Sequence, residues 1–375
     1  AETFVLLKNE GNLLPLKKQG KIALIGPLAD TRNNIAGTWS VAQAPEKYTT
    51  IKEAMEKALD GQATLLYAQG SNIWRDRELQ KNGEQGKSIA WGDEVKMKNE
   101  ALQIAKEADV IVCAMGETAD MSGECASRTN LEMPDVQQEL LAELAKMGKP
   151  VVLLNFAGRP TVLSWENEHI PAIMNVWFGG SEMGDALCNV IFGDKVPSGK
   201  LTTSMPKTTG QEPLYYNHQN TGRPVPDDNQ KFAKFASNCM DVSNGPLYPF
   251  GYGLSYTTFE YGDLKLSSHQ VNMDDWKITA TINVKNTGSR DADEVVQLYI
   301  RDMVASISRP VKELKGFQRI HLAAGESREI SFDITPEMLK FYNAELKHVI
   351  EPGDFQIMVG GNSKEVKTQN LTVKN

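Results

Sequence analysis

The sequence predicts two successive architectures, a mostly parallel α/β sandwich followed by an all-β sandwich. At 375 residues the chain is longer than one typical domain. From Lys21 to about Pro206, short apolar runs alternate with amphipathic segments, whereas the C-terminal part alternates apolar and polar residues with a period of two. We therefore expect an α/β domain over residues 1–209, a connecting segment over 210–262 and a β-sandwich over 263–375.

The first region contains near-continuous apolar runs bounded by Gly or Pro, as expected of strands buried on both faces. They are KIALIG, ATLLYA, VIVCAMG, PVVLLNFAG and PAIMNVWFGG. Helical periodicity separates them in TIKEAMEKALDG, EVKMKNEALQIAKEAD and PDVQQELLAELAKMG. Strands that alternate with helices favour a parallel sheet with helices on both faces.

The second region begins after a segment rich in Pro, Gly, Asn and Tyr. In WKITATINVKN, residues Ile278, Ala280, Ile282 and Val284 alternate with polar residues. Further strand candidates are EVVQLYIRD, VKELKGFQRI, SREISFDIT, DFQIMVGG and KTQNLTVKN. About seven short strands over roughly 110 residues favour an immunoglobulin-like or fibronectin-like sandwich.

Composition excludes several classes of function. A formal net charge of −8 with scattered Lys and Arg argues against nucleic acid as a partner, and the sequence contains no apolar run long enough to span a membrane. The histidines are dispersed, the cysteines show no CxxC spacing, and no GxGxxG follows the first strand, so we expect neither a metal site nor a dinucleotide site. Cys113 and Cys188 lie in apolar patterns and are predicted to be buried thiols.

The loop DMSGECASRTN follows the strand VIVCAMG, at the edge of the sheet where ligands gather in such folds. Its carboxylate Glu124 is either one half of a solvated ion pair with Arg128 or a proton donor to a leaving oxygen. Glu117 is the competing carboxylate and could equally brace the loop, as could Arg128. Trp39 belongs either to the core or to a surface on which a sugar ring stacks.

Four motifs in order resemble glycoside hydrolase family 3. They are AETFVLLKNEGNLLPL, SGECASRTNLEMP, VWFGGSEMGDALCNVIFGDKVPSGKLTTSMP and PLYPFGYGLSYTTFEY. The chain is similar to the C-terminal two-thirds of that family's enzymes, above all to bacterial periplasmic beta-glucosidases. The resemblance implies a five- or six-stranded α/β sandwich followed by a fibronectin type III-like domain.

The resemblance also implies the chemistry. Glu124 matches the family's general acid/base, which reaches across to an N-terminal (β/α)8 barrel, and Trp39 matches an aromatic residue that stacks on the leaving-group sugar. The barrel supplies the nucleophilic aspartate, so the nucleophile has no counterpart in this chain. A retaining glycosidase needs two carboxyl groups about 5–5.5 Å apart, which makes this chain half a site.

The sequence therefore predicts the C-terminal part of a retaining beta-glucosidase that acts on terminal beta-linked glucose without a cofactor. Its partners would be a small beta-glucoside or oligosaccharide and the barrel of the same protein, in the periplasm or outside the cell. Two alternatives remain, a non-catalytic carbohydrate-binding or structural module and a beta-xylosidase. The chain begins abruptly, and we expect residues 1–7 to form a poorly anchored helical segment that would pack on the barrel.

Overall fold

The computed structural model describes residues 1–81, 83–225 and 232–375. The chain divides into two compact units: unit 1 comprises residues 1–199 and 206–210, and unit 2 comprises residues 200–205 and 211–375. The separate status of residues 210–262 as a connecting segment stays a prediction. Among the described residues, no helix has the length and apolar character needed to cross a membrane.

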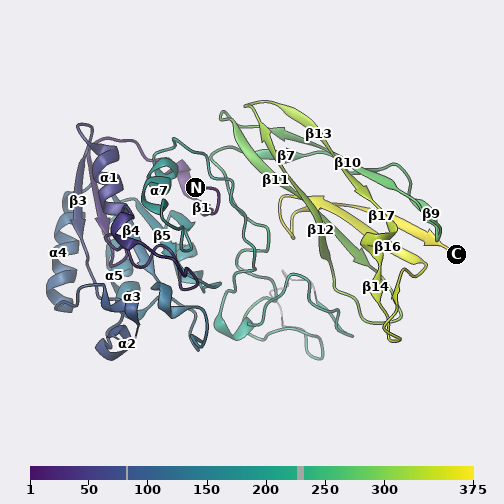
Figure 1. The fold of residues 1–375 in the computed structure, drawn as a ribbon, viewed down its shortest axis with the longest axis horizontal. Coiled ribbons are helices and arrows are strands. Elements are labelled where there is room, and N and C mark those ends of the chain that lie inside the picture. Colours follow the sequence, from purple (N-terminus) through teal and green to yellow (C-terminus); the bar gives the residue numbers. More distant parts are fainter. Residues whose placement is uncertain (82, 226–231) are drawn as a thin grey trace. The chain divides into compact units, whose positions relative to one another are not determined.

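Unit 1 is built on a mixed, mostly parallel sheet, which confirms the predicted fold class (Figure 1). Within the described residues this sheet has six strands in the order β1-β6-β5-β4-β2-β3. Their bounds are β1 Val5–Asn9, β2 Lys21–Ile25, β3 Thr64–Ala68, β4 Val110–Gly116, β5 Val151–Phe156 and β6 Ala172–Asn175. All pairings are parallel except that of β1 with β6.

The described helices of unit 1 are α1 Ile51–Leu59, α2 Arg77–Lys81, α3 Glu84–Lys87, α4 Glu94–Glu107, α5 Asp135–Ala145, α6 Ser164–His169 and α7 Met183–Ile191. Of these, α1, α4 and α5 lie in the three segments whose periodicity predicts helices. Thr50 and Glu53 form a capping box that fixes the start of α1. Helix α1 packs on α7 and α4 packs on α5. Right-handed crossovers that run in opposite directions along the sheet put α1 and α4 on opposite faces.

The prediction for residues 1–7 is wrong. Val5–Asn9 forms an edge strand, antiparallel to β6, and Phe4 through Leu7 are at most 1% exposed. The apolar residues have the spacing of a helix face, but as a strand paired with β6 the segment satisfies its backbone and buries the four apolar side chains Phe4–Leu7. The segment is anchored within unit 1.

The strand order reverses between β2 and β4. The chain passes from β2 outward to β3 and then crosses to β4 on the other side of β2. In open α/β sheets the loops that leave the carboxyl ends of the strands diverge at such a point and leave a crevice for a ligand. The loops after β2, β4 and β5 therefore define the edge of the sheet at which a site is expected.

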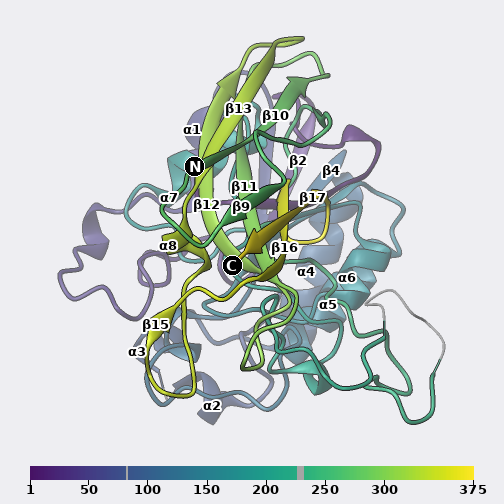
Figure 2. The same cartoon turned by 90° about the vertical axis from the view of Figure 1, so that its right-hand side faces the viewer.

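Unit 2 contains a β-sandwich of the predicted kind (Figure 2). One sheet has the order β13-β10-β7, with β8 also paired to β10, and the other has the order β12-β11-β16-β17-β9. The bounds are β7 Phe259–Tyr261, β8 Lys265–Leu266, β9 Gln270–Asn272, β10 Ile278–Asn286, β11 Ala292–Asp302, β12 Glu313–Leu322, β13 Ser327–Ile334, β16 Gly353–Gly360 and β17 Val366–Lys374. A short helix, α8 Pro336–Leu339, precedes the ribbon of β14 Phe341–Tyr342 and β15 His348–Val349.

The core of the sandwich follows the period of two. Ile278, Ala280, Ile282 and Val284 of β10 are all buried, as predicted. They pack with residues of the opposite sheet, among them Val296, Leu298, Ile357 and Leu371. The alternation seen in the sequence is therefore the inside and outside of the sandwich.

Candidate active site at the carboxyl edge of the sheet

Glu124 lies in the loop that connects β4 to α5, beyond the carboxyl end of β4. The loop begins at Gly116, whose N–H donates to Oε1 of the buried Gln137 at 2.8 Å and whose carbonyl accepts from Nε2 of the same side chain at 3.0 Å. Glu124 itself is exposed. A fixed starting point and an exposed tip are what a carboxyl group needs to meet a substrate.

Glu117 is buried and holds the base of this loop. It is 1% exposed, and its carboxylate lies 2.7 Å from Nη1 of Arg128 and 3.2 Å from Nε of Arg159. Its backbone N–H donates to the carbonyl of Phe156 at the end of β5. Arg128 thus pairs with Glu117 and not with Glu124, which removes the solvated Glu124–Arg128 pair as an explanation of the motif.

Arg128 has further contacts at the far end of the loop. Its Nη2 donates to the carbonyl of Glu132 at 2.9 Å, and its guanidinium lies over the indole of Trp74, 5.2 Å from the ring centroid. The side chain of Arg128 is 11% exposed. Arg128 therefore ties the end of the loop to the buried carboxylate at its start.

Arg159 is a residue that the sequence analysis missed. It follows β5 in NFAGRP, and its Nη2 donates to the carbonyls of Met121 and Ala126, the latter at 2.6 Å. A signal was available in the sequence, because a cation just past the end of a buried strand lies at the same edge as the loop after the neighbouring strand. The choice among the other arginines could not be made without knowing the strand order.

Trp39 lies in the loop after β2 and meets the Glu124 loop at Gly123. Thr38 Oγ1 donates to the carbonyls of Ala119 and Ser122, the latter at 2.9 Å. A Cβ atom at Gly123, which has φ of +100°, would lie 3.1 Å from the Thr38 methyl and 3.3 Å from the Trp39 indole nitrogen. Glycine therefore permits this contact, both by its backbone conformation and by its size. Trp39 is 70% exposed, so it is not a core residue.

The loops after β2 and β4 are joined by a second contact. Oδ1 of the buried Asn34 accepts from the N–H of Ala119 at 3.0 Å. The exposed indole and the exposed carboxylate thus stand on neighbouring loops on the two sides of the point where the strand order reverses. This is the position at which an open α/β sheet binds its ligand.

A cavity of about 410 Å³ opens beside the same loop. Its wall includes Trp74, Asp120, Met121, Cys125 and Arg128. Asp120 Oδ2 accepts from the N–H of Gly86, which joins the α2–α3 segment to the loop. The space combines an aromatic face with polar groups, as small-molecule sites do.

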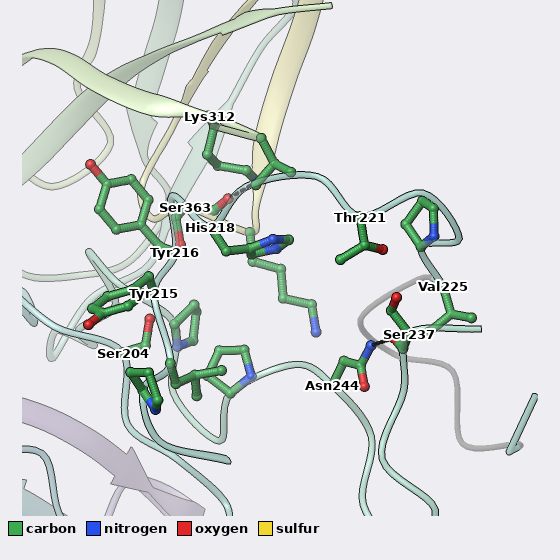
Figure 3. A pocket seen from close by; sticks show the side chains of 17 residues that line it. Ser204, Tyr215, Tyr216, His218, Thr221, Val225, Ser237, Asn244, Lys312 and Ser363 are labelled. Atoms are coloured by element: carbon green, nitrogen blue, oxygen red, sulfur yellow. Dashed lines mark hydrogen bonds between the residues drawn. The ribbon is translucent and has the colours of Figure 1, made fainter. Parts of the chain in front are cut away.

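Unit 2 contains a second cavity, of about 450 Å³, lined by residues from the segment before the sandwich and from the sandwich itself (Figure 3). Lys312 donates to the carbonyl of Ser363 on one side, and Asn244 donates to the carbonyl of Ser237 on another. Tyr215, which is 62% exposed, also lines it. The described residues that line it include no Asp or Glu, so the loop of Glu124 remains the candidate active site.

Other predicted features have clear positions. Cys113 and Cys188 are buried as predicted, and burial raises the pKa of the Cys188 thiol to about 12, whereas Cys125 and Cys239 are exposed. Among the described residues, no group of His, Cys, Asp and Glu side chains could hold a metal ion.

The chain matches the model of the Glycosyl hydrolase family 3 C-terminal domain over residues 4–256, and a fibronectin type III-like domain model over residues 294–363. A periplasmic beta-glucosidase of Salmonella typhimurium is 45% identical over 98% of this chain and 48% of its own length. A beta-xylosidase of Formosa agariphila is 37% identical over 100% of this chain and 49% of its own length.

A solved structure of similar fold is the beta-glucosidase from Listeria innocua in complex with glucose. It has a TM-score of 0.85 and 35% identity, and the match covers 99% of this chain and 48% of that one. The chain thus spans about half the length of the curated relatives it matches. With its α/β unit and its sandwich both matched, the chain belongs to glycoside hydrolase family 3, of which it carries the C-terminal and fibronectin type III-like domains.

Proposed function

We propose that this chain is the C-terminal part of a retaining beta-glucosidase and that Glu124 is the general acid/base. The observation that carries the proposal is the exposed Glu124 carboxylate beside the exposed Trp39, on the two loops where the strand order reverses. In double displacement, an acid protonates the glycosidic oxygen as the nucleophile attacks, and the resulting carboxylate then activates water. Two carboxyl groups supply this chemistry without a cofactor.

Trp39 contributes a binding surface in this proposal. An indole offers a flat apolar face to the apolar face of a sugar ring, and the contact of the Trp39 indole nitrogen with Gly123, the residue before Glu124, supports this role. The relatives support glucose as the sugar: one matched structure is described as a complex with glucose and another as a complex with laminaribiose. The beta-xylosidase relative keeps xylose as an alternative.

Glu117 and Arg128 serve as supports of the loop in this proposal. The buried carboxylate of Glu117 pairs with Arg128 and with Arg159. Arg128 also donates to the carbonyl of Glu132 and so closes the loop. Neither side chain is needed to transfer a proton. The Glu117 carboxylate is 1% exposed and is enclosed by two guanidinium groups, so it does not face a substrate.

The second carboxyl group comes from outside this chain. The resemblance assigns it to an N-terminal barrel, in agreement with the match to about half of each relative. We expect the chain alone to leave aryl beta-glucosides intact and the complete enzyme, which joins it to the barrel, to hydrolyse them. The periplasmic relative favours the periplasm as the place of action.

The test compares leaving groups in the complete enzyme. Glu124→Ala should lower kcat/KM for phenyl beta-glucoside by about 10²–10⁴-fold, because phenolate leaves slowly without a proton. The loss for 2,4-dinitrophenyl beta-glucoside should be far smaller, because that leaving group needs little protonation. Glu132→Gln, an exposed carboxylate of the same loop, is the matched control and should change neither value. Equal losses for both substrates would assign the proton transfer to another residue.

A binding role is the second candidate, and the cavity of unit 2 favours it (Figure 3). Tyr215 and hydroxyl and amide groups line a space large enough for a sugar. Under this alternative, Tyr215→Ala would lower retention of the protein on an immobilised beta-glucan and leave hydrolysis of a small glucoside unchanged. Unchanged retention would rule out a binding role for this cavity.

A further inference from the structure

We infer that Arg159 is the positioning residue for Glu124, a role that rests on the proposed function and adds to it a residue from a different loop. The guanidinium fixes the backbone on both sides of Glu124 and thereby sets where its carboxyl group stands. Met121 and Ala126, whose carbonyls accept from Nη2, lie three residues before and two residues after Glu124.

The contacts of Arg159 use separate edges of its planar group. Nη2 serves the two carbonyls of the loop, and Nε lies 3.2 Å from the Glu117 carboxylate. The Arg159 side chain is 19% exposed and Glu117 is 1% exposed, so water weakens these contacts little. One rigid group thus joins the tip of the loop to the buried charge at its base.

Arg159 is itself held in place by the sheet. It follows β5 by three residues, and the N–H of the preceding Gly158 donates to Oε2 of Glu117 at 3.3 Å. A Cβ atom at Gly158 would lie 1.9 Å from Ser122 Oγ, so glycine lets this turn approach the Glu124 loop. Pro160 comes next and restricts the backbone on the other side. Two neighbouring parallel strands, β4 and β5, therefore deliver the loop and its clamp to the same edge.

Arg128 does not duplicate this function. It donates to Glu117 and to the carbonyl of Glu132, which lies eight residues beyond Glu124. Arg159 brackets Glu124 directly, whereas Arg128 closes the loop farther on. A lysine at position 159 would carry the charge, but its single ammonium group has no fork with which to reach the two carbonyls and the carboxylate in one plane.

The test uses Arg159→Lys and Arg159→Ala in the complete enzyme with the two aryl glucosides. Because an acid misplaced by about 1 Å can cost on the order of a hundredfold, kcat/KM for phenyl beta-glucoside should fall by about that factor in Arg159→Ala and by less in Arg159→Lys. The value for the dinitrophenyl glucoside should fall much less. Arg75→Lys is the matched control, because Arg75 also pairs with several carboxylates but lies 47% exposed.

The selectivity between leaving groups separates positioning from general stability. A loss of folded enzyme lowers kcat/KM for both substrates by the same factor. If Arg159→Ala does not fold, the comparison is made with Arg159→Lys. Equal losses in Arg159→Lys, or none, with selective loss in Glu124→Ala, would overturn the inference and leave the proposed function standing. Equal losses in Glu124→Ala would instead count against the proposed function.

Discussion

Strand β10 and the loop from Glu117 to Arg128 are held by different forces. Every second residue of β10 enters an apolar core, and the strand pairs with β13 along eight positions. The loop buries little apolar surface and is held by one buried carboxylate, two guanidinium groups and hydrogen bonds to backbone carbonyls. Removing atoms from an apolar core lowers the unfolding free energy by an amount that grows with the volume of the cavity left behind. Removing one partner of a buried ion pair instead leaves an uncompensated charge in the interior.

The largest effect on stability is expected at the charge network. Glu117→Gln should lower the free energy of unfolding by about 3–5 kcal/mol, because Arg128 and Arg159 would keep their charges in a buried site without the carboxylate. Urea denaturation of the full-length protein measures the change. Glu94→Gln removes a half-exposed partner of Arg75, one of three, and should cost less than about 1 kcal/mol. Similar losses of unfolding free energy in Glu117→Gln and Glu94→Gln would show that the loop network is no more stabilising than an ion pair at the surface.

The apolar core should respond to a cavity. Ile282→Ala deletes buried methyl groups from β10 and should cost about 3–4 kcal/mol of unfolding free energy. At a temperature where the variant is folded, kcat/KM for both aryl glucosides should stay at the wild-type value, because Ile282 lies in the core of unit 2 and Glu124 belongs to unit 1. A selective fall for phenyl beta-glucoside would show that the sandwich influences the acid.

Glu166, a buried carboxyl group on α6, should make the stability of unit 1 depend on pH. Burial, and then the charge of Glu132, raises the pKa of Glu166 from 4.5 to about 7. Between pH 4.5 and pH 7 the Glu166 carboxyl group is therefore protonated in the folded protein and ionised in the unfolded chain. The stability due to Glu166 is present in full below pH 4.5 and is lost as the pH rises through 7.

Replacing Glu166 should therefore stabilise the protein at high pH. At pH 8, Glu166→Gln should raise the unfolding free energy by up to about 3 kcal/mol, and at pH 4.5 the difference should vanish. Thermal unfolding at both values measures it, with the exposed Glu168→Gln on the same helix as the control. A stabilisation that is independent of pH would show that charge is not its cause.

The smallest effect concerns the exposed indole. Trp39→Ala should leave stability unchanged, because the side chain is 70% exposed. It should raise KM about tenfold for a glucoside whose leaving group is a sugar, equivalent to about 1.4 kcal/mol of lost contact. An aryl glucoside whose leaving group is small gives the reference value. An unchanged KM for the sugar glycoside would place the leaving group elsewhere.

Periodicity explains how much of the fold could be predicted. Helix α1 and strand β10 each show one face buried at regular spacing, so their existence and their cores follow from the sequence. Periodicity does not identify β1, since a short apolar run such as Phe4–Leu7 fits a helical turn as well as an edge strand.

The candidate site was less predictable because its contacts are polar and distant in sequence. The loop and its residues Glu117, Glu124 and Arg128 were found from their place after a strand. The partner of Arg128 depends on which carboxylate is buried, which no local pattern records. Arg159 reaches carbonyls 38 and 33 residues away, and backbone carbonyls carry no mark in a sequence.

The role of Glu124 is tested most directly by the product that azide forms with Glu124→Ala in the complete enzyme. With a retaining mechanism, the sugar is held on the nucleophile through its alpha face, and without a general base water attacks slowly. Azide needs no base and attacks the opposite face. We predict faster turnover of 2,4-dinitrophenyl beta-glucoside with azide and a beta-glucosyl azide product, identified by the anomeric proton coupling in its NMR spectrum. No acceleration, or an alpha-glucosyl azide, would contradict the assignment of Glu124 as the general acid/base.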